Sequence, residues 1–168
     1  MKLQILLLLT TIGFAGMGQE TDVQKPASLS LHAGAYNFGK GKGGSTMMLG
    51  VGFLKGLSPL LDYTHTIQGS FVRYAFKSGP VSTTDRLLLE TDFSLHVKAM
   101  NDRHLLVPYA GLGLGLSCYT RYIGAYLPLK AGLQIKLVKC TYLLASLQYR
   151  TALSANVTSN VCYTLGIS

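Results

Sequence analysis

The sequence predicts an all-β fold, an eight-stranded antiparallel up-and-down β-barrel of the transmembrane kind. Three observations predict it. Apolar and polar residues alternate with a period of two along nearly the whole chain after the N-terminus, turn-forming residues interrupt the alternation at short intervals, and the polar face is rich in small and charged residues. The 168 residues suffice for one domain, and a charged fraction of 13% is about half the share found in soluble domains.

The N-terminus has the pattern of an export signal. Lys2 provides a short positive region, an apolar run follows over residues 5–14, and Gly16 and Gly18 place small residues on either side of Met17 at a cleavage site. Beyond this run, no segment approaches the ~20 apolar residues that a membrane-spanning helix needs. We therefore expect a signal peptide over residues 1–18, a short mature leader over 19–27 and the barrel domain over 28–168.

The first three predicted strands cover residues 29–38, 46–55 and 60–76. Each alternates apolar residues with small or polar ones, and glycine, serine and threonine supply much of the second face. In the third segment the phase of the alternation slips near Val72 and Arg73, which predicts a β-bulge there.

The other five predicted strands alternate more regularly. In the fourth, Leu89 and Phe93 alternate with Glu90 and Asp92, and in the fifth, leucines alternate with glycines over residues 111–116. In the last three, leucine, isoleucine, valine and tyrosine occupy one face and polar residues the other. These strands cover residues 86–100, 106–119, 127–139, 142–153 and 160–168.

Short connections join the predicted strands, as an up-and-down barrel with an even number of strands requires. They are rich in glycine, proline, serine and asparagine, the residues that favour turns. The predicted connections are residues 39–45, 56–59, 77–84, 101–104, 123–125, 140–141 and 154–159.

The composition of the two faces distinguishes a membrane barrel from a soluble one. A soluble barrel needs an apolar interior, which glycines and charges do not supply, and its exterior would carry a broad apolar belt in water. In lipid the apolar face meets acyl chains, and barrel closure satisfies the backbone hydrogen bonds. We therefore expect an inward polar core made of Asp62, Glu90, Asp92, Lys98, Lys130, Gln134, Lys136, Gln148 and Arg150.

Eight strands enclose an interior that side chains fill, so a wide diffusion pore is not expected. The net charge of +8 favours anionic lipid head groups over nucleic acid as partners of an exported protein. We expect outer-loop contacts to lipopolysaccharide phosphates, with solvated loop charges as the alternative, at Lys40, Lys42, Lys77 and Arg121. The three cysteines, Cys118, Cys140 and Cys162, fit no metal motif and are expected to act as small apolar residues.

Catalytic signals are weak. The glycine-rich stretch at residues 39–46 lacks the Gly-Lys-Ser/Thr ending of a phosphate-binding loop, and the glycines at residues 111–115 share one strand face rather than open a helix. The histidines form no constellation with a serine or aspartate at the outer rim, and we expect neither a catalytic site nor a cofactor. The histidines are His32, His65, His96 and His104.

The chain resembles the small eight-stranded outer-membrane barrels of the OmpX and OmpA-barrel type, within the broader porin-like group of outer-membrane β-barrel domains. The residues that carry the resemblance are 107–115 (VPYAGLGLG), the turn at 56–60 (GLSPL) and the alternating last strand. The resemblance covers nearly all of the mature chain. One departure is the ending Gly166-Ile167-Ser168, where such barrels usually end in an aromatic residue.

The resemblance implies a location in a bacterial outer membrane more directly than an activity. We expect a monomeric, non-enzymatic barrel with an envelope-structural or surface-interaction role; the alternatives are a lipid-modifying enzyme or a narrow pore for ions or small solutes. Strands three to five are expected to exceed the ~9–11 residues that span a bilayer. An edge around residues 71–76 and 86–89 would then recruit a surface protein by strand addition, or form ordered strand tips.

Overall fold

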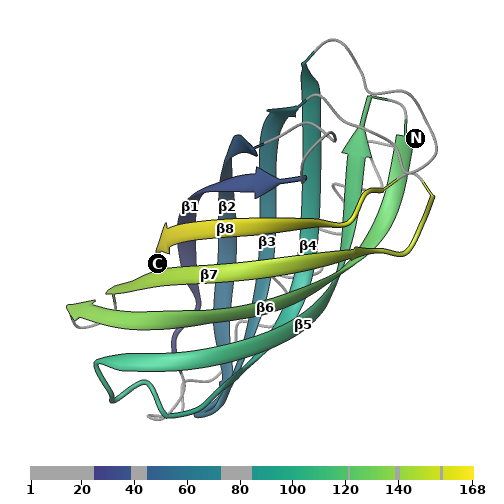
Figure 1. The fold of residues 1–168 in the computed structure, drawn as a ribbon. Helices are drawn as coiled ribbons and strands as arrows, with labels where there is room; N and C mark the ends of the chain where they lie inside the picture. Colours follow the sequence, from purple (N-terminus) through teal and green to yellow (C-terminus); the bar gives the residue numbers. More distant parts are fainter. Residues whose placement is uncertain (1–24, 39–44, 73–84, 121, 139–140, 156) are drawn as a thin grey trace.

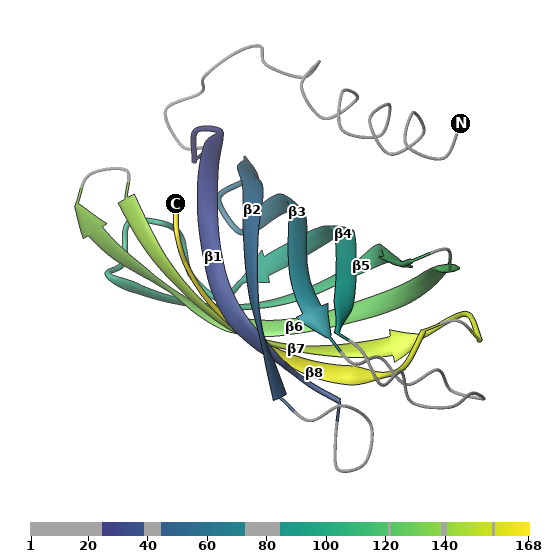
Figure 2. The same cartoon turned by 90° about the horizontal axis from the view of Figure 1, so that it is seen from above.

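The fold is a closed barrel of eight antiparallel strands (Figures 1 and 2). The structure is a computed structural model that describes residues 25–38, 45–72, 85–120, 122–138, 141–155 and 157–168. Each strand pairs with the next and β8 pairs with β1, which confirms the predicted fold class. The strands are β1 (Ser28–Asn37), β2 (Ser45–Ser58), β3 (Leu61–Val72), β4 (Arg86–Lys98), β5 (Leu106–Tyr119), β6 (Tyr122–Val138), β7 (Thr141–Ala152) and β8 (Asn160–Ile167).

The two ends of the barrel are named here by the chain termini. At the terminal end, β1 begins and β8 finishes, and the hydroxyl oxygens of Ser28 and Ser168 lie 2.6 Å apart. Because successive strands run in opposite directions, the β2–β3, β4–β5 and β6–β7 connections also lie at this end. The far end carries the other four connections. The expected signal peptide, residues 1–18, lies outside the described residues.

Side chains alternate between the two faces of the wall, because successive residues of a strand point to opposite sides. The outward face is apolar: Leu29 is 74% exposed and Met47 79% exposed. The inward face of β4 contains Glu90 and Asp92, which are 3% and 1% exposed. Within the described part of the chain, no helix has the length and apolar character needed to cross a membrane.

The prediction was wrong for the β5–β6 connection. The chain turns after Tyr119 rather than at residues 123–125, and β6 already begins at Tyr122. Thr120 has a φ of 58°, in the left-handed region that a tight hairpin turn uses. Gly124 has the composition of a turn residue, yet it continues the inward face of β6 opposite Ser117. The boundary predicted from turn-forming composition was therefore wrong. With these residues included, β6 has 17 residues.

The bulge predicted near Val72 and Arg73 is not present at Val72, and Arg73 lies outside the described residues. Val72 points inward in phase with the rest of β3 and pairs in register with Arg86. Val72 interrupts the alternation of apolar and polar residues because it is an apolar residue at an inward position. The interior around it is apolar as well. The register shifts occur at the terminal end, at Gly56/Ser58 in β2 and Lys136/Val138 in β6. The described lengths of β3, β4 and β5 are 12, 13 and 14 residues, and residues 73–84 lie outside the described part.

Rings lying over glycines explain why the inward face is rich in glycine. Four inward histidine or tyrosine rings each lie against the glycine directly opposite on the neighbouring strand, where a Cβ atom would overlap the ring. The wall can therefore hold large rings without widening. The pairs are His32 with Gly166, His96 with Gly111, Tyr126 with Gly115 and Tyr109 with Gly132.

Gly113→Ala is expected to lower the free energy of unfolding by ~1–3 kcal/mol, the usual cost of overpacking. A Cβ atom there would overlap the Phe93 carbonyl oxygen and lie 2.9 Å from the Cα of Ser94, and neither backbone atom can rotate away. Gly69→Ala is the matched control, because its Cβ would face outward with its nearest neighbour 3.7 Å away. Urea titration of the folded protein measures both; equal effects would contradict the prediction.

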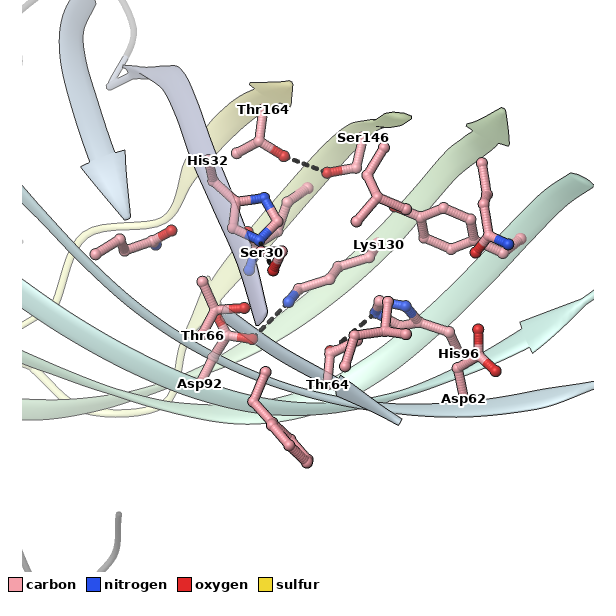
Figure 3. Close-up of a pocket in the computed structure, with 17 residues that line it drawn as sticks. Ser30, His32, Asp62, Thr64, Thr66, Asp92, His96, Lys130, Ser146 and Thr164 are labelled. Atoms are coloured by element: carbon pink, nitrogen blue, oxygen red, sulfur yellow. Dashed lines mark hydrogen bonds and ion pairs between the residues drawn. The ribbon is translucent and has the colours of Figure 1, made fainter. Parts of the chain in front are cut away.

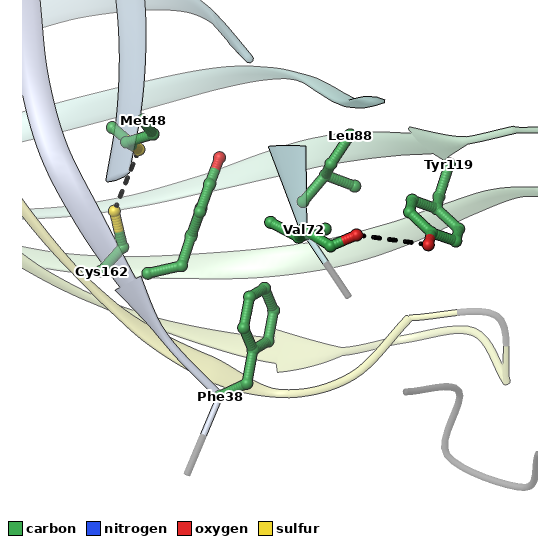
Figure 4. Packing of buried hydrophobic residues seen from close by; sticks show 7 residues of the cluster. Phe38, Met48, Val72, Leu88, Tyr119 and Cys162 are labelled. Carbon is green, nitrogen blue, oxygen red and sulfur yellow. Dashed lines mark hydrogen bonds between the residues drawn. The ribbon is translucent and has the colours of Figure 1, made fainter. Parts of the chain in front are cut away.

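An apolar cluster fills the inside of the barrel at the far end, and we call it the far-end layer (Figure 4). The Tyr119 hydroxyl donates a hydrogen bond to the Val72 carbonyl oxygen at 3.3 Å, and the sulfur atoms of Cys162 and Met48 lie 3.5 Å apart. The sequence had predicted a polar interior. The far-end layer shows that this is wrong for one end of the barrel. The layer consists of Tyr36, Phe38, Met48, Val72, Leu88, Tyr119 and Cys162.

A smaller apolar cluster of Leu54, Tyr142 and Leu144 lies inside the barrel toward the terminal end. The polar interior is thus bounded by apolar side chains at both ends. The far-end layer draws on five neighbouring strands and on β8, whereas the terminal-end cluster involves only β2 and β7. The far end is consequently the more completely closed by apolar packing.

Candidate functional site in the barrel interior

The nine residues predicted for the inward core lie on the inward face of β3, β4, β6 and β7. Seven of them are buried, Lys130 has a side chain only 8% exposed, and Lys136 is half-buried. The structure joins all nine into three groups of hydrogen bonds and ion pairs along the barrel. The buried ones are Asp62, Glu90, Asp92, Lys98, Gln134, Gln148 and Arg150.

The group nearest the far end is centred on Glu90. Its Oε2 atom accepts hydrogen bonds from the Tyr36 hydroxyl at 2.5 Å and from Gln68 Nε2 at 3.2 Å, and it pairs with the Arg150 guanidinium. Arg150 also donates to Gln148 Oε1 at 3.2 Å. The arginine is 1% exposed, so its charge is balanced by a carboxylate with almost no access to water.

Arg150 is held by aromatic rings as well as by Glu90. Its guanidinium carbon lies 4.9 Å from the ring centroid of Tyr36 and 5.0 Å from that of Tyr126. A planar guanidinium is suited to this position because it stacks on rings and forms hydrogen bonds at the same time. β1, β4, β6 and β7 therefore meet at one buried group that crosses the barrel.

The middle group joins Lys130 to Asp92, with Nζ and Oδ1 2.5 Å apart (Figure 3). The Ser94 hydroxyl donates to the same carboxylate oxygen at 3.1 Å. Beside this pair is a cavity of about 40 Å³, which Asp92, Lys130 and Gln148 help to line. Asp92 Oδ2 and Gln148 Nε2 have no hydrogen-bond partner, and a polar cavity of this size admits water.

The third group lies toward the terminal end. Lys98 Nζ is 2.7 Å from Asp62 Oδ1 and 2.6 Å from Asp102 Oδ2. Gln134 Nε2 donates to the other Asp102 oxygen at 2.8 Å, and Lys136 Nζ lies 3.5 Å from the Asp102 carbonyl oxygen. Asp102 belongs to the β4–β5 connection, so sequence alternation did not place it inside the barrel.

Lys25 is a further interior residue, and strand alternation does not predict it. It precedes β1, yet it is only 5% exposed, and its Nζ donates to Gln134 Oε1 at 2.8 Å. Burial lowers the pKa of the Lys25 ammonium to about 8, while the carboxylates of Asp62 and Asp102 act in the opposite direction. No periodic pattern marks a single lysine in a polar segment, so the sequence contains no signal for it.

The histidines and serines do not form an accessible catalytic arrangement in the described part of the chain. His32 Nε2 lies 2.7 Å from the Ser30 hydroxyl, but Ser30 is 3% exposed inside the barrel. His96 is also inward, 3.4 Å from the Thr64 hydroxyl (Figure 3). His65 lies on the outward face and stacks on Phe93, with ring centroids 4.2 Å apart.

The structure describes only some of the other predicted residues. Lys40, Lys42, Lys77, Arg121 and Cys140 lie outside the described residues. Of the expected projecting edge, Phe71 and Val72 pair with Leu87 and Arg86, while Leu88 and Leu89 pair with β5. Cys118 and Cys162 are free thiols. Among the described residues, no three histidine, cysteine, aspartate or glutamate side chains are arranged to hold a metal ion.

These features define a small closed barrel with an apolar exterior and a charge-paired interior, the fold class of the eight-stranded outer-membrane barrels. The crystal structure of Neisserial surface protein A (NspA) superposes with a TM-score of 0.62, at 14% identity, over 84% of this chain and 96% of that one. The N-terminal β-barrel domain of Pseudomonas aeruginosa OprF gives a TM-score of 0.59, at 14% identity, over 86% and 96%.

Both solved structures are eight-stranded outer-membrane barrels, which confirms the fold resemblance inferred from the sequence. At 14% identity the likeness concerns the fold alone. Neither a known protein-family profile nor a curated protein matches the sequence.

Proposed function

We propose that the chain is an integral outer-membrane β-barrel that acts without catalysis, as a structural or surface-interaction component of a bacterial envelope. The observation that carries the proposal is the combination of an apolar exterior with an interior filled by packed side chains. Large apolar side chains exposed on every strand would be unfavourable in water and are favourable against acyl chains.

The filled interior argues against a pore. A permeating ion would have to cross the far-end layer, where most side chains are apolar and the hydroxyls of Tyr36 and Tyr119 already donate to Glu90 and to the Val72 carbonyl oxygen. Apart from the half-buried Lys136, the interior charges are also balanced, with Lys25, Lys98, Lys130 and Arg150 beside Asp62, Glu90, Asp92 and Asp102. Balanced pairs leave no excess charge to attract an ion of either sign.

The burial of Ser30 beside His32 argues against an enzyme that acts on lipid. A lipid substrate reaches a barrel from its outer rim or its lipid-facing surface, whereas the Ser30–His32 pair lies inside the wall. Ser30 is also covered by its neighbours, since a Cβ atom on Gly52 would lie 2.6 Å from its hydroxyl oxygen. The pair therefore fits a structural hydrogen bond better than a nucleophile and its base.

Further parts of the proposal concern export and partners. The expected signal peptide would be removed after Gly18, and the terminal end would face the periplasm. Lys40, Lys42, Lys77 and Arg121 would then contact lipopolysaccharide phosphates at the far end. The paired tips at Phe71–Val72 and Arg86–Leu87 are the described part of the edge at which an extended surface protein would add a strand.

Complementation of a deletion strain tests the proposed role. If the barrel supports the envelope, its loss should increase sensitivity to detergent, and expression of the intact chain should restore resistance. Ser30→Ala, which removes the serine hydroxyl that lies 2.7 Å from His32 Nε2, should restore resistance equally well. Restoration by the intact chain but not by a folded Ser30→Ala variant would favour the enzyme and overturn the proposal.

The conductance of the purified barrel is a second test of the same proposal. In planar bilayers it should leave the conductance at the level of a protein-free membrane, because the far-end layer blocks the path. Heat-unfolded protein at the same concentration is the control. Sustained conductance steps from the folded protein alone would favour a pore instead.

A further inference from the structure

The ammonium group of Lys25 occupies a well-defined position at the terminal end of the barrel interior. Its Nζ donates to Gln134 Oε1 at 2.8 Å and lies 3.8 Å from the ring centroid of Tyr142. These groups come from β6 and β7, whereas Lys25 precedes β1. The lysine therefore reaches across the interior to two strands that are distant from it in sequence.

The surroundings of this ammonium have the chemistry of a binding site for a primary amine. An amide oxygen accepts one N–H, an aromatic face attracts the cation, and two carboxylates lie close enough to affect its charge. The Gln134 oxygen is held toward Lys25 because the Gln134 Nε2 atom donates to Asp102 at 2.8 Å. The receiving groups are therefore fixed by the barrel itself.

The charges at this end also require a cation. Asp62 and Asp102 share the single ammonium of Lys98, so these three side chains together carry one excess negative charge. Lys25 compensates that charge, and both carboxylates favour its charged form. Lys136 contacts Asp102 only through the backbone carbonyl oxygen, at 3.5 Å, and lies nearer the rim.

The wall of the barrel leaves room for the backbone of Lys25. The Gly56 amide donates to the Lys25 carbonyl oxygen at 3.2 Å. A Cβ atom at residue 56 would lie 2.8 Å from the Lys25 nitrogen and 2.9 Å from its Cβ, which is closer than such atoms normally approach. The register shift between Gly56 and Ser58 is in the same place. The backbone of β2 thus positions Lys25 for its contacts across the barrel.

We propose that the terminal end of the barrel is a binding site for a primary ammonium group, which Lys25 fills, so that Lys25 closes this end of the interior. The polar cavity is bounded on this side by Gln134 and Leu144, next to the lysine. Displacement of Lys25 would open a path to the cavity from the terminal end and free the site for an external alkylammonium ion. This inference does not depend on the location or the role proposed above.

Thiol labelling of a reporter in the cavity tests the proposal in the full-length folded protein. Ser146→Cys places the reporter on the cavity wall, in a chain whose cysteines Cys118, Cys140 and Cys162 are replaced by alanine. A small, charged thiol reagent should label this parent chain slowly. Lys25→Ala should increase the labelling rate about tenfold, because it removes both the charge-assisted hydrogen bond and the cation–π contact.

The alkylammonium ion itself gives the decisive result. n-Butylammonium has the length and charge of the lysine side chain, so it should slow the labelling of the Lys25→Ala chain toward the parent rate. n-Butanol, of similar size but uncharged, should give no protection. An unchanged rate for Lys25→Ala, or equal protection by the alcohol, would overturn the proposal.

Two further variants separate the charge from packing and folding. Lys25→Met keeps an apolar stem over Tyr142 but lacks the ammonium, and it should label as fast as Lys25→Ala; labelling at the parent rate would show that the stem alone closes the end. Lys55→Ala, at a half-buried lysine near the same end of β2, should not change the rate. Because Lys25 precedes β1, each variant should keep the gel mobility of the folded barrel.

Discussion

Glu90→Ala is expected to lower the free energy of unfolding by ~3–5 kcal/mol, the largest effect of any substitution considered for this chain. The carboxylate holds Arg150, Tyr36 and Gln68 through one oxygen atom. Its removal leaves the guanidinium, 1% exposed, without a counter-charge in the centre of the barrel. The cost arises from this uncompensated buried charge more than from the lost ion pair.

A double-mutant comparison separates these two contributions. Glu90→Leu combined with Arg150→Met should recover most of the loss, because apolar pairs of similar volume often replace buried ion pairs at little cost. Lys136→Ala is the control and should change stability by less than ~0.5 kcal/mol, as half-exposed positions usually do. Urea titration in phospholipid vesicles measures the stability of all three variants, with the gel mobility of the folded barrel as the signal. A single Glu90→Ala variant within ~1 kcal/mol of the intact chain would show that the pair is not isolated from water.

Leu114→Arg should destabilise the barrel in phospholipid vesicles by ~2–4 kcal/mol, the cost of an outward arginine near the middle of a bilayer. Leu114 lies in the central part of β5, points outward and is 62% exposed. In water such a leucine gains nothing from its surroundings, so a soluble barrel would tolerate arginine there. The variant therefore tests the membrane location independently of any activity.

Leu105→Arg is the matched control for this test. Leu105 is 71% exposed but belongs to the β4–β5 connection, beyond the ends of both strands. Arginine near the membrane interface costs only ~0–1 kcal/mol. Equal stabilities of the two variants, measured by the same urea titration, would contradict an outward surface immersed in lipid.

The strands could be predicted because alternation is a strong signal in a wall with one apolar face. The eight segments and the inward direction of Glu90, Asp92 and Arg150 follow from that period of two. Boundaries were less predictable. Gly124 has turn-forming composition although it continues β6, and Val72 looked out of phase although it points inward.

The interior could be predicted only where polarity marked it. The far-end layer contains Met48 and Leu88, which share the inward parity of their polar neighbours but differ from them in character. A rule that assigns polar residues to the inside does not identify such positions. Lys25 and Asp102 are outside the strands, so no alternation places them. Their positions depend on the closure of the barrel, which brings Lys25, the β4–β5 connection and β6 together.

The two-residue alternation also gives the lipid a part in assembly. A slip of one residue in any strand pair exchanges the two faces of that strand. In β4 it would turn Glu90 and Asp92 toward the acyl chains and Leu89 and Phe93 toward the polar interior. Insertion into a bilayer would then reject the misaligned barrel and retain the aligned one. Membrane insertion would thereby also select the correct register of strand pairing.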